Sequence, residues 1–192
     1  NMSKIAYMGL DPGKSGFITL FMDGEFTFYS MPYHKVDTGK VSKTGKPVMA
    51  SAFNEEGFRQ LTLDIREKTA GYVLKVAVEE VGGRGGWSAT NNFNFGYVAG
   101  LQRMVFIMLG AEITTVRPQK WQSYMRQGYD NIKKASSTGK TMINDPKAVA
   151  AMIVEKEYPN IDFRKSERSK NIDDNKVDSF LVCLYLYRIQ NS

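Results

Sequence analysis

Four acidic side chains stand at positions where a fold could gather them around a metal ion. Asp11 directly follows the first apolar run of the chain, and Glu79 closes a second one, residues 73–78. Asp174 and Asp178 lie near the start of the apolar segment that ends the chain. Carboxylate oxygens suit hard divalent cations, and two magnesium ions about 4 Å apart can hydrolyse a phosphodiester by activating water and stabilising the leaving oxygen. These residue types therefore predict a metal-dependent phosphodiesterase.

The spacing of the two C-terminal acids matters because it places them on one face of a helix. Residues four apart in an α-helix are separated by about 40° around its axis. Asp174 and Asp178 would therefore point to the same side, whereas Asp173 would point elsewhere. Two neighbouring carboxylates repel each other, so this pair should bind cations or titrate as a coupled pair.

Each acid, taken alone, also has a purely structural interpretation. Asp11 opens the sequence Asp-Pro-Gly, which is common in turns, and Glu79 would serve as a solvated strand end. Asp173 and Asp174 would suit the N-terminus of a helix, where the helix dipole favours negative charge. Asp178 does not fit this interpretation, because it lies one turn inside the helix among apolar residues. The combination of all four favours a metal site.

Length and charge limit the functions that are open to the chain. Its 192 residues predict one domain spanning residues 1–192. The net charge of +6 favours a polyanionic partner, either nucleic acid or an acidic membrane surface. No apolar stretch approaches the roughly 18 residues of a membrane span and no signal-peptide pattern is present, so we expect a cytoplasmic protein. Cys183 and His34 are the only residues of their types, which argues against a disulfide framework and against nucleophilic catalysis.

The elements predicted from hydrophobic periodicity begin with three strands and then alternate. Strands are predicted at residues 4–10, 16–22, 25–31, 73–80 and 111–116. Helices are predicted at residues 53–68, 92–109, 119–125, 146–157 and 173–189. Asp23-Gly24 is typical of a two-residue hairpin, and Asn54 and Pro146 are typical of helix starts. The polar residues 33–52 indicate an excursion or flexible loop. This order predicts an α/β sheet layered with helices.

The motifs, taken in order, resemble the RuvC family of Holliday-junction resolvases within the ribonuclease H-like superfamily. The resembling segments are residues 9–16 around Asp11, 77–81 around Glu79, 93–100 at the start of a long helix, 116–121, and 174–182. The chain departs from cellular members in the spacing of its closing acids, which lie four apart as in phage-type members rather than three. The aromatic residue that usually follows the second acid is replaced by a glycine-rich stretch with Arg84 and Trp87.

The resemblance implies a ribonuclease H-like fold, with a mixed five-stranded sheet and helices on both faces. It implies a structure-selective endodeoxyribonuclease that cleaves branched DNA, most simply a four-way junction. Two Mg²⁺ ions per active site, with Mn²⁺ able to substitute, would be held by the catalytic acids Asp11, Glu79, Asp174 and Asp178. A phage-encoded member would act in the cytoplasm of the host cell.

Positively charged residues gather in two segments, both expected to be loops, that would contact DNA. The first extends to residue 144 and contains Lys120, Arg126, Lys133, Lys134 and Lys140; the second spans residues 164–170. Such residues would contact phosphates, although charge runs are also common on solvated surfaces. Arg84 and Trp87 would stack on an exposed base at a branch point, unless Trp87 packs on the core.

The long helix predicted at 92–109 is expected to carry a homodimer interface. Tyr97, Leu101, Met104, Val105 and Met108 recur at helical spacing, while Phe93, Val98 and Phe106 lie on other faces. A helix that is apolar on more than one side must bury the surplus face, in its own chain or against a partner. RuvC dimers pair through this helix, and symmetric cleavage of a junction requires two active sites, so the resemblance favours a homodimer.

Three other functions remain open. Another ribonuclease H-fold nuclease would cleave an RNA–DNA hybrid or a flap, and a non-catalytic relative would bind branched DNA without cutting it. An actin-like sugar or acetate kinase also opens with an Asp-Gly hairpin, but that fold needs two such halves and this chain is too short to hold them.

Overall fold

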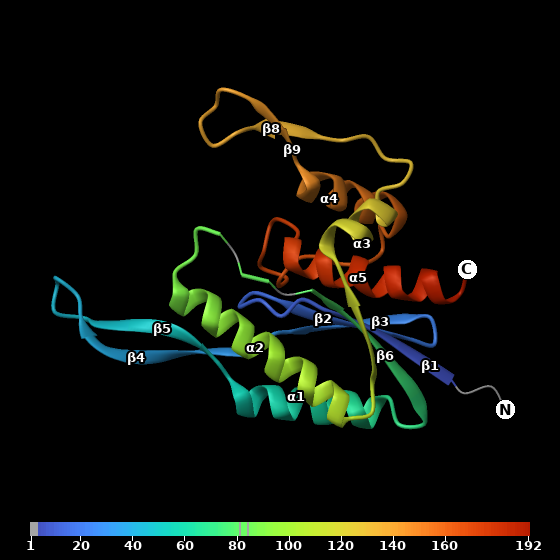
Figure 1. The fold of residues 1–192 in the computed structure, drawn as a ribbon, viewed down its shortest axis with the longest axis horizontal. Helices are drawn as coiled ribbons and strands as arrows, with labels where there is room; N and C mark the ends of the chain where they lie inside the picture. Colours follow the sequence, from blue (N-terminus) through green and yellow to red (C-terminus); the bar gives the residue numbers. More distant parts are fainter. Residues whose placement is uncertain (1–3, 81, 84) are drawn as a thin grey trace.

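A five-stranded mixed sheet forms the centre of the computed structural model, which describes residues 4–80, 82–83 and 85–192 (Figure 1). The strands are β1 (Lys4–Leu10), β2 (Phe17–Met22), β3 (Glu25–Ser30), β6 (Tyr72–Glu79) and β7 (Glu112–Val116), in the spatial order β3-β2-β1-β6-β7. The first three pair antiparallel, and β6 and β7 continue the sheet parallel to β1. This order and these directions are those of the ribonuclease H-like fold, so the predicted α/β fold class is confirmed.

Helices cover both faces of this sheet, as predicted. One face carries α3 (Pro118–Met125), α4 (Pro146–Glu157) and α5 (Asp174–Gln190), and the other carries α1 (Glu55–Lys68) and α2 (Ala89–Met108). Side chains of β1 alternate between the two layers, as the strand period requires. Tyr7 packs in the cluster with α5, whereas Met8 and Leu10 pack with Phe58 of α1 and Phe106 of α2.

Turn residues and helix-capping side chains fix the ends of several strands and helices. Asp23 and Gly24 have φ of 51° and 84°, which suits a tight two-residue turn between strands, and Met22 pairs with Glu25 across it. Asn54 caps α1 by accepting a hydrogen bond from the Gly57 amide at 2.9 Å. Asp145 caps α4, which begins at Pro146 as predicted. Asp173 caps α5, because its carboxylate accepts hydrogen bonds from the Asn175 and Lys176 amides.

Two segments that the sequence indicated as loops are β-hairpins. Residues 33–52 contain β4 (Tyr33–Val41) and β5 (Pro47–Phe53), and the basic segment contains β8 (Lys133–Ala135) and β9 (Met142–Asn144). Both hairpins are largely exposed, so they lack the alternation of apolar and polar residues that marks a strand packed on a core. The segment 164–170 is enclosed by an isolated antiparallel bridge between Arg164 and Ile172.

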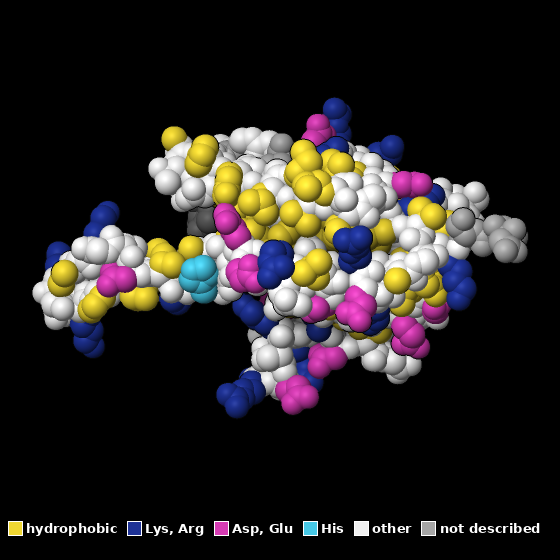
Figure 2. All heavy atoms as spheres, turned by 90° about the horizontal axis from the view of Figure 1, so that it is seen from below, with side chains coloured by type: hydrophobic (Ala, Val, Ile, Leu, Met, Phe, Trp, Pro, Cys, Tyr) yellow, Lys and Arg dark blue, Asp and Glu magenta, His cyan; other side chains and the backbone are white. Residues whose placement is uncertain are grey.

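Helix α2 begins at Ala89, three residues before the predicted start, because Ser88 caps it through the Asn91 amide. Its buried face holds Val98 and Phe106, and Leu101 and Val105 also pack against the core rather than on the outer face. The outer face carries five exposed apolar residues, here called the α2 stripe: Phe93, Tyr97, Met104, Ile107 and Met108. Phe93 therefore lies on the same face of α2 as Tyr97, whereas the sequence pattern had assigned the two residues to different faces. Figure 2 shows hydrophobic side chains gathered on the face that carries α1 and α2.

No helix in the described part of the chain combines the length and the apolar character that crossing a membrane requires.

Candidate active site

Asp11 and Glu79 lie side by side at the carboxyl edge of the sheet. The strands β1 and β6 are parallel neighbours in which Leu10 pairs with Val78, so the two acids occupy the next position in the register. Tyr7 and Ala77, earlier on the same strands, pack toward α5, and the strand period directs Asp11 and Glu79 to that same face. Both acids line one cavity of about 610 Å³. The structure therefore places the two strand-end acids next to each other at one cavity.

A glycine allows α5 to lie directly on β1. A Cβ atom at Gly9 would stand 2.2 Å from the Ser179 carbonyl oxygen and 2.5 Å from the Cys183 amide nitrogen, which is closer than atoms can approach. The buried hydroxyls of Thr19 and Ser179 are hydrogen-bonded at 2.8 Å and hold the same helix to β2. Because Asp178 directly precedes Ser179, this close packing fixes its distance from the strand ends.

The electrostatics of Asp178 show that the acids converge. Burial, followed by the negative charges of Asp11 and Glu79, raises the pKa of Asp178 to about 7. Lys147 opposes this shift, and Asp174 adds to it. Asp178 forms no hydrogen bond or ion pair with any residue that the structure describes. Among the described residues, its negative charge is therefore compensated only by cations that do not contact it directly, Lys147 and Arg126.

Asp174 lies one helical turn before Asp178, at the more open side of the cluster. Its carboxylate forms an ion pair with the Lys147 ammonium at 2.9 Å, which ties α5 to α4. This hydrogen bond, together with the charge of Asp174, raises the pKa of Lys147. Asp173 is occupied in capping the helix and takes no part in the cluster.

Neighbouring groups orient the two strand-end acids. The indole nitrogen of Trp121 donates a hydrogen bond to Glu79 Oε1 at 2.7 Å, and Trp121 itself is only 1% exposed. The Gly13 amide donates to Asp11 Oδ1 at 3.1 Å within the Asp-Pro-Gly turn. Sequence reasoning included Trp121 in a motif without giving it a role. A buried indole must find an acceptor for its N–H, but the burial of Trp121 depends on the packing of α3 and is not evident from the sequence.

A second residue that the sequence did not single out is Gln102 of α2. Its side chain is fully buried, and its amide nitrogen lies 3.5 Å from the Pro12 carbonyl oxygen, beside Asp11. Nothing in the sequence distinguished this glutamine, because its importance depends on where α2 crosses the loop after β1.

The four acids fit a divalent cation by their chemistry. All their donors are carboxylate oxygens, the class that Mg²⁺ prefers, and a bound cation would relieve the repulsion that raises the pKa of Asp178. Within the described part of the chain, however, no group of three or more acidic, histidine or cysteine side chains is arranged to hold one metal ion.

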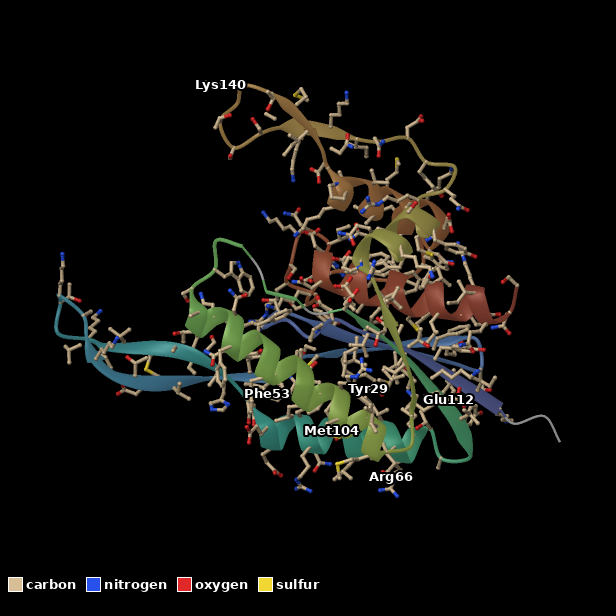
Figure 3. All side chains as sticks on the ribbon, viewed as in Figure 1. Tyr29, Phe53, Arg66, Met104, Glu112 and Lys140 are labelled. Atoms are coloured by element: carbon tan, nitrogen blue, oxygen red, sulfur yellow. The ribbon has the colours of Figure 1, made fainter. Side chains whose placement is uncertain are left out.

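The predicted DNA-binding lysines and arginines differ in their exposure and in their partners. Arg126 is half-buried beside Asp178; burial lowers its pKa, and the charge of Asp178 opposes that change. Lys120, Lys133 and Lys140 are exposed, and Figure 3 places Lys140 at the tip of the β8–β9 hairpin. Lys134 is also exposed but pairs with Asp145 at 3.3 Å. Arg84 lies outside the described residues.

Trp87 is 43% exposed, so it does not pack down into the core. Its ring meets Phe95 edge-on, with centroids 5.8 Å apart, at the start of α2. Both aromatics line a second cavity, of about 740 Å³, which also reaches Asp11. Trp87 therefore lies near Asp11, and its stacking on a DNA base stays a prediction.

No protein-family model matches the sequence, and no curated protein matches it. Among solved structures, Thermus thermophilus RuvC is similar, with 12% sequence identity and a TM-score of 0.46 over 97% of both chains. The structure of T. thermophilus RuvC in complex with a Holliday junction substrate gives 10% identity and the same TM-score, covering 97% of this chain and 96% of that one. At these values the fold class rests on the strand order and directions described above.

Proposed function

We propose that the protein is a metal-dependent endodeoxyribonuclease that cleaves branched DNA, with a four-way junction as its substrate. The observation that carries the proposal is the convergence of Asp11, Glu79 and Asp178, which is expressed in the raised pKa of Asp178. A buried acid whose pKa is perturbed by neighbouring acids is typical of a functional site. The net charge of +6 supports a polyanionic substrate.

The acids Asp11, Glu79, Asp174 and Asp178 would hold two Mg²⁺ ions, or Mn²⁺ in their place, which would supply charge neutralisation and an activated water for phosphodiester hydrolysis. Trp121 and the Gly13 amide restrict the rotation of Glu79 and Asp11, so the donor oxygens are oriented in advance. Arg126 brings positive charge beside Asp178 and would attract the phosphodiester to this edge of the sheet.

A homodimer is part of the proposal. The α2 stripe exposes 71% of Phe93 and 79% of Met108, near the two ends of one helix. A continuous apolar face of this kind marks an interaction surface in a soluble protein. A second copy related by two-fold symmetry would cover it and present two active sites to the two strands of a junction.

The four-residue spacing of Asp174 and Asp178 supports a phage-type member of the RuvC-like nucleases. With that origin, the protein would act in the cytoplasm of the host cell.

One observation favours a second candidate, a non-catalytic protein that binds branched DNA. It is the finding that no three of the described acids are gathered closely enough to share an ion. Such a protein would keep the basic surfaces and the fold while leaving its substrate intact.

Cleavage assays on matched substrates distinguish these functions. A labelled four-way junction, a flap, a linear duplex and an RNA–DNA hybrid are incubated with the protein, with Mg²⁺ or with EDTA. We expect paired, symmetric cuts in the junction that require Mg²⁺, and much slower cutting of the other substrates. Tight binding of the junction without any cleavage would favour the non-catalytic protein. Faster cutting of the hybrid or the flap would show that this nucleic acid, rather than the junction, is the substrate.

A further inference from the structure

The β4–β5 hairpin stands away from the rest of the molecule, while its root is firmly attached. Figure 1 shows it projecting beyond the sheet, on the side where β1 ends, and Figure 2 shows it as an arm that stands out from the rest of the molecule. At the root, the rings of Tyr33 and Phe53 pack at 5.5 Å, and Phe53 packs on Phe58 of α1 at 5.3 Å. The Asn54 amide also donates to the Pro32 carbonyl at 3.0 Å. The direction of the hairpin is therefore set by the core.

Hydrogen bonds within the hairpin hold its outer part in shape. The Ser42 amide donates to the Lys46 carbonyl at 2.8 Å across the tip. The Thr38 hydroxyl donates to the Val48 carbonyl at 2.7 Å, where the register of the two strands shifts. A ribbon that is already ordered does not lose further backbone entropy when it binds a partner.

The hairpin is strongly basic. Residues 33–53 hold four lysines and one aspartate, which gives a net charge of +3 with histidine neutral. The lysines are Lys35, Lys40, Lys43 and Lys46. All four are exposed, and none forms an ion pair with another residue that the structure describes. Uncompensated like charges on a narrow ribbon repel each other, and a polyanion would relieve that repulsion.

The position and size of the hairpin identify which polyanion fits. Tyr33, Ser51 and Phe53 at its root line the same cavity as Asp11, so a substrate held at the acids would continue toward the hairpin. At about 3.3 Å per residue, the 9 residues of β4 extend about 30 Å, which is close to one turn of B-DNA. A two-stranded ribbon also fits the roughly 12 Å width of the major groove.

We propose that the β4–β5 hairpin binds a duplex arm of the branched DNA, about one helical turn away from the cleavage site. The lysines contact phosphates on the arm, and Val41 and Met49, which are 68% and 49% exposed, face the groove as apolar contacts. The location of the branch point at the acidic cluster rests on the proposed function; the contact between the hairpin and duplex DNA does not.

The test compares two double variants that remove the same charge. Lys40→Gln/Lys43→Gln alters the tip of the hairpin, and Arg66→Gln/Lys68→Gln alters α1, where Figure 3 shows Arg66 on the side away from the sheet. Junction affinity is measured by fluorescence anisotropy in EDTA at several salt concentrations. One junction has arms of about 20 base pairs, and the other has loop-closed arms of about 6 base pairs, which reach only about 20 Å.

With the long arms, we expect the hairpin variant to flatten the slope of log K against log salt by up to about 2, while the α1 variant keeps the wild-type slope. With the short arms, the hairpin variant should bind like the wild type, because the tip has no duplex to contact. An unchanged slope on long arms, or an equal loss on both junctions, would overturn the proposal. So would a change of oligomeric mass in the hairpin variant, since the hairpin would then bind a second copy of the chain.

Cleavage in Mg²⁺ separates this inference from the proposed function. If the protein cuts the junction and the hairpin variant keeps the wild-type salt slope, the nuclease proposal stands and the hairpin contact is overturned. If the protein cuts nothing, yet the hairpin variant flattens the salt slope on the long-armed junction alone, the hairpin contact stands and the nuclease proposal is overturned. Melting curves check that both variants are folded, which is expected because all four substituted side chains are exposed.

Discussion

The buried indole of Trp121 donates a hydrogen bond of 2.7 Å to the carboxylate of Glu79, across 42 residues of sequence. This contact links α3 to the end of β6 and selects one orientation of the acid. It makes Trp121 a positioning residue, because it would act on the reaction only through Glu79.

Replacing Trp121 with Phe should therefore slow cleavage while leaving DNA binding nearly intact. The ring keeps most of the buried volume, but the charged hydrogen bond, worth about 1.5–3 kcal/mol, is lost. We expect a single-turnover rate roughly 10- to 100-fold lower at saturating junction. Trp87→Phe is the control, because it changes the other tryptophan and keeps the hydrogen bond from Trp121 to Glu79. A wild-type rate in Trp121→Phe would show that Glu79 needs no such orientation.

Neutralising single acids should abolish cleavage without weakening binding. Asp11→Asn, Glu79→Gln, Asp174→Asn and Asp178→Asn each preserve the shape of the side chain and remove a charge that a divalent cation needs. Gel-shift affinities should stay within a few-fold of the wild type, since the phosphate contacts lie elsewhere. Asp173→Asn is the matched control, because Asn caps helices as well as Asp does, and it should still cut. Loss of activity in that control would mean that the register of the C-terminal acids is wrong.

The stability of the protein should depend on pH through Asp178. Folded Asp178 keeps its proton up to about pH 7, whereas in the unfolded chain it loses the proton near pH 4. Between these values the folded state holds more protons, so the free energy of unfolding falls as the pH rises. In EDTA, Asp178→Asn should therefore be more stable than the wild type at pH 8, by on the order of 2–4 kcal/mol, and the difference should vanish near pH 4.

Urea unfolding at several pH values measures this difference, with Asp173→Asn as the variant that should follow the wild type. Adding Mg²⁺ at pH 8 should raise the melting temperature of the wild type more than that of Asp178→Asn, because the ion compensates the buried charge. A pH-independent difference between the two proteins would mean that Asp178 is not perturbed by its neighbours.

Gly9 should not tolerate a methyl group. Gly9→Ala would place Cβ against the Ser179 carbonyl oxygen and force α5 away from β1, which should cost about 1–3 kcal/mol of unfolding free energy. Gly82→Ala is the control, because a Cβ there meets nothing within 4 Å. Denaturant titration measures both changes. If Gly9→Ala were as stable as the wild type, the close packing that places Asp178 would have to be looser than described.

The sequence predicted the sheet and the positions of the acids because both depend on local patterns. Apolar runs gave the strands, and Asp11 and Glu79 were recognisable as residues at their ends. The β4–β5 and β8–β9 hairpins were missed because exposed ribbons need not alternate apolar and polar residues. The roles of Trp121, Gln102 and Gly9 could not be derived either, since each depends on a contact with a distant part of the chain.

The α2 stripe gives a prediction about assembly. Light scattering at micromolar concentration should give twice the chain mass of 21.7 kDa. Met104→Glu places a charge in the middle of the stripe, where Met104 is 54% exposed, and should yield a monomer, because burying an unpaired carboxylate in an apolar interface is costly. Met142→Glu makes the same change at a 62% exposed position on β9 and should remain a dimer. If the wild type is a monomer both free and on junction DNA, the stripe is not a self-interface, and a nuclease that cuts one strand at a time becomes the better description.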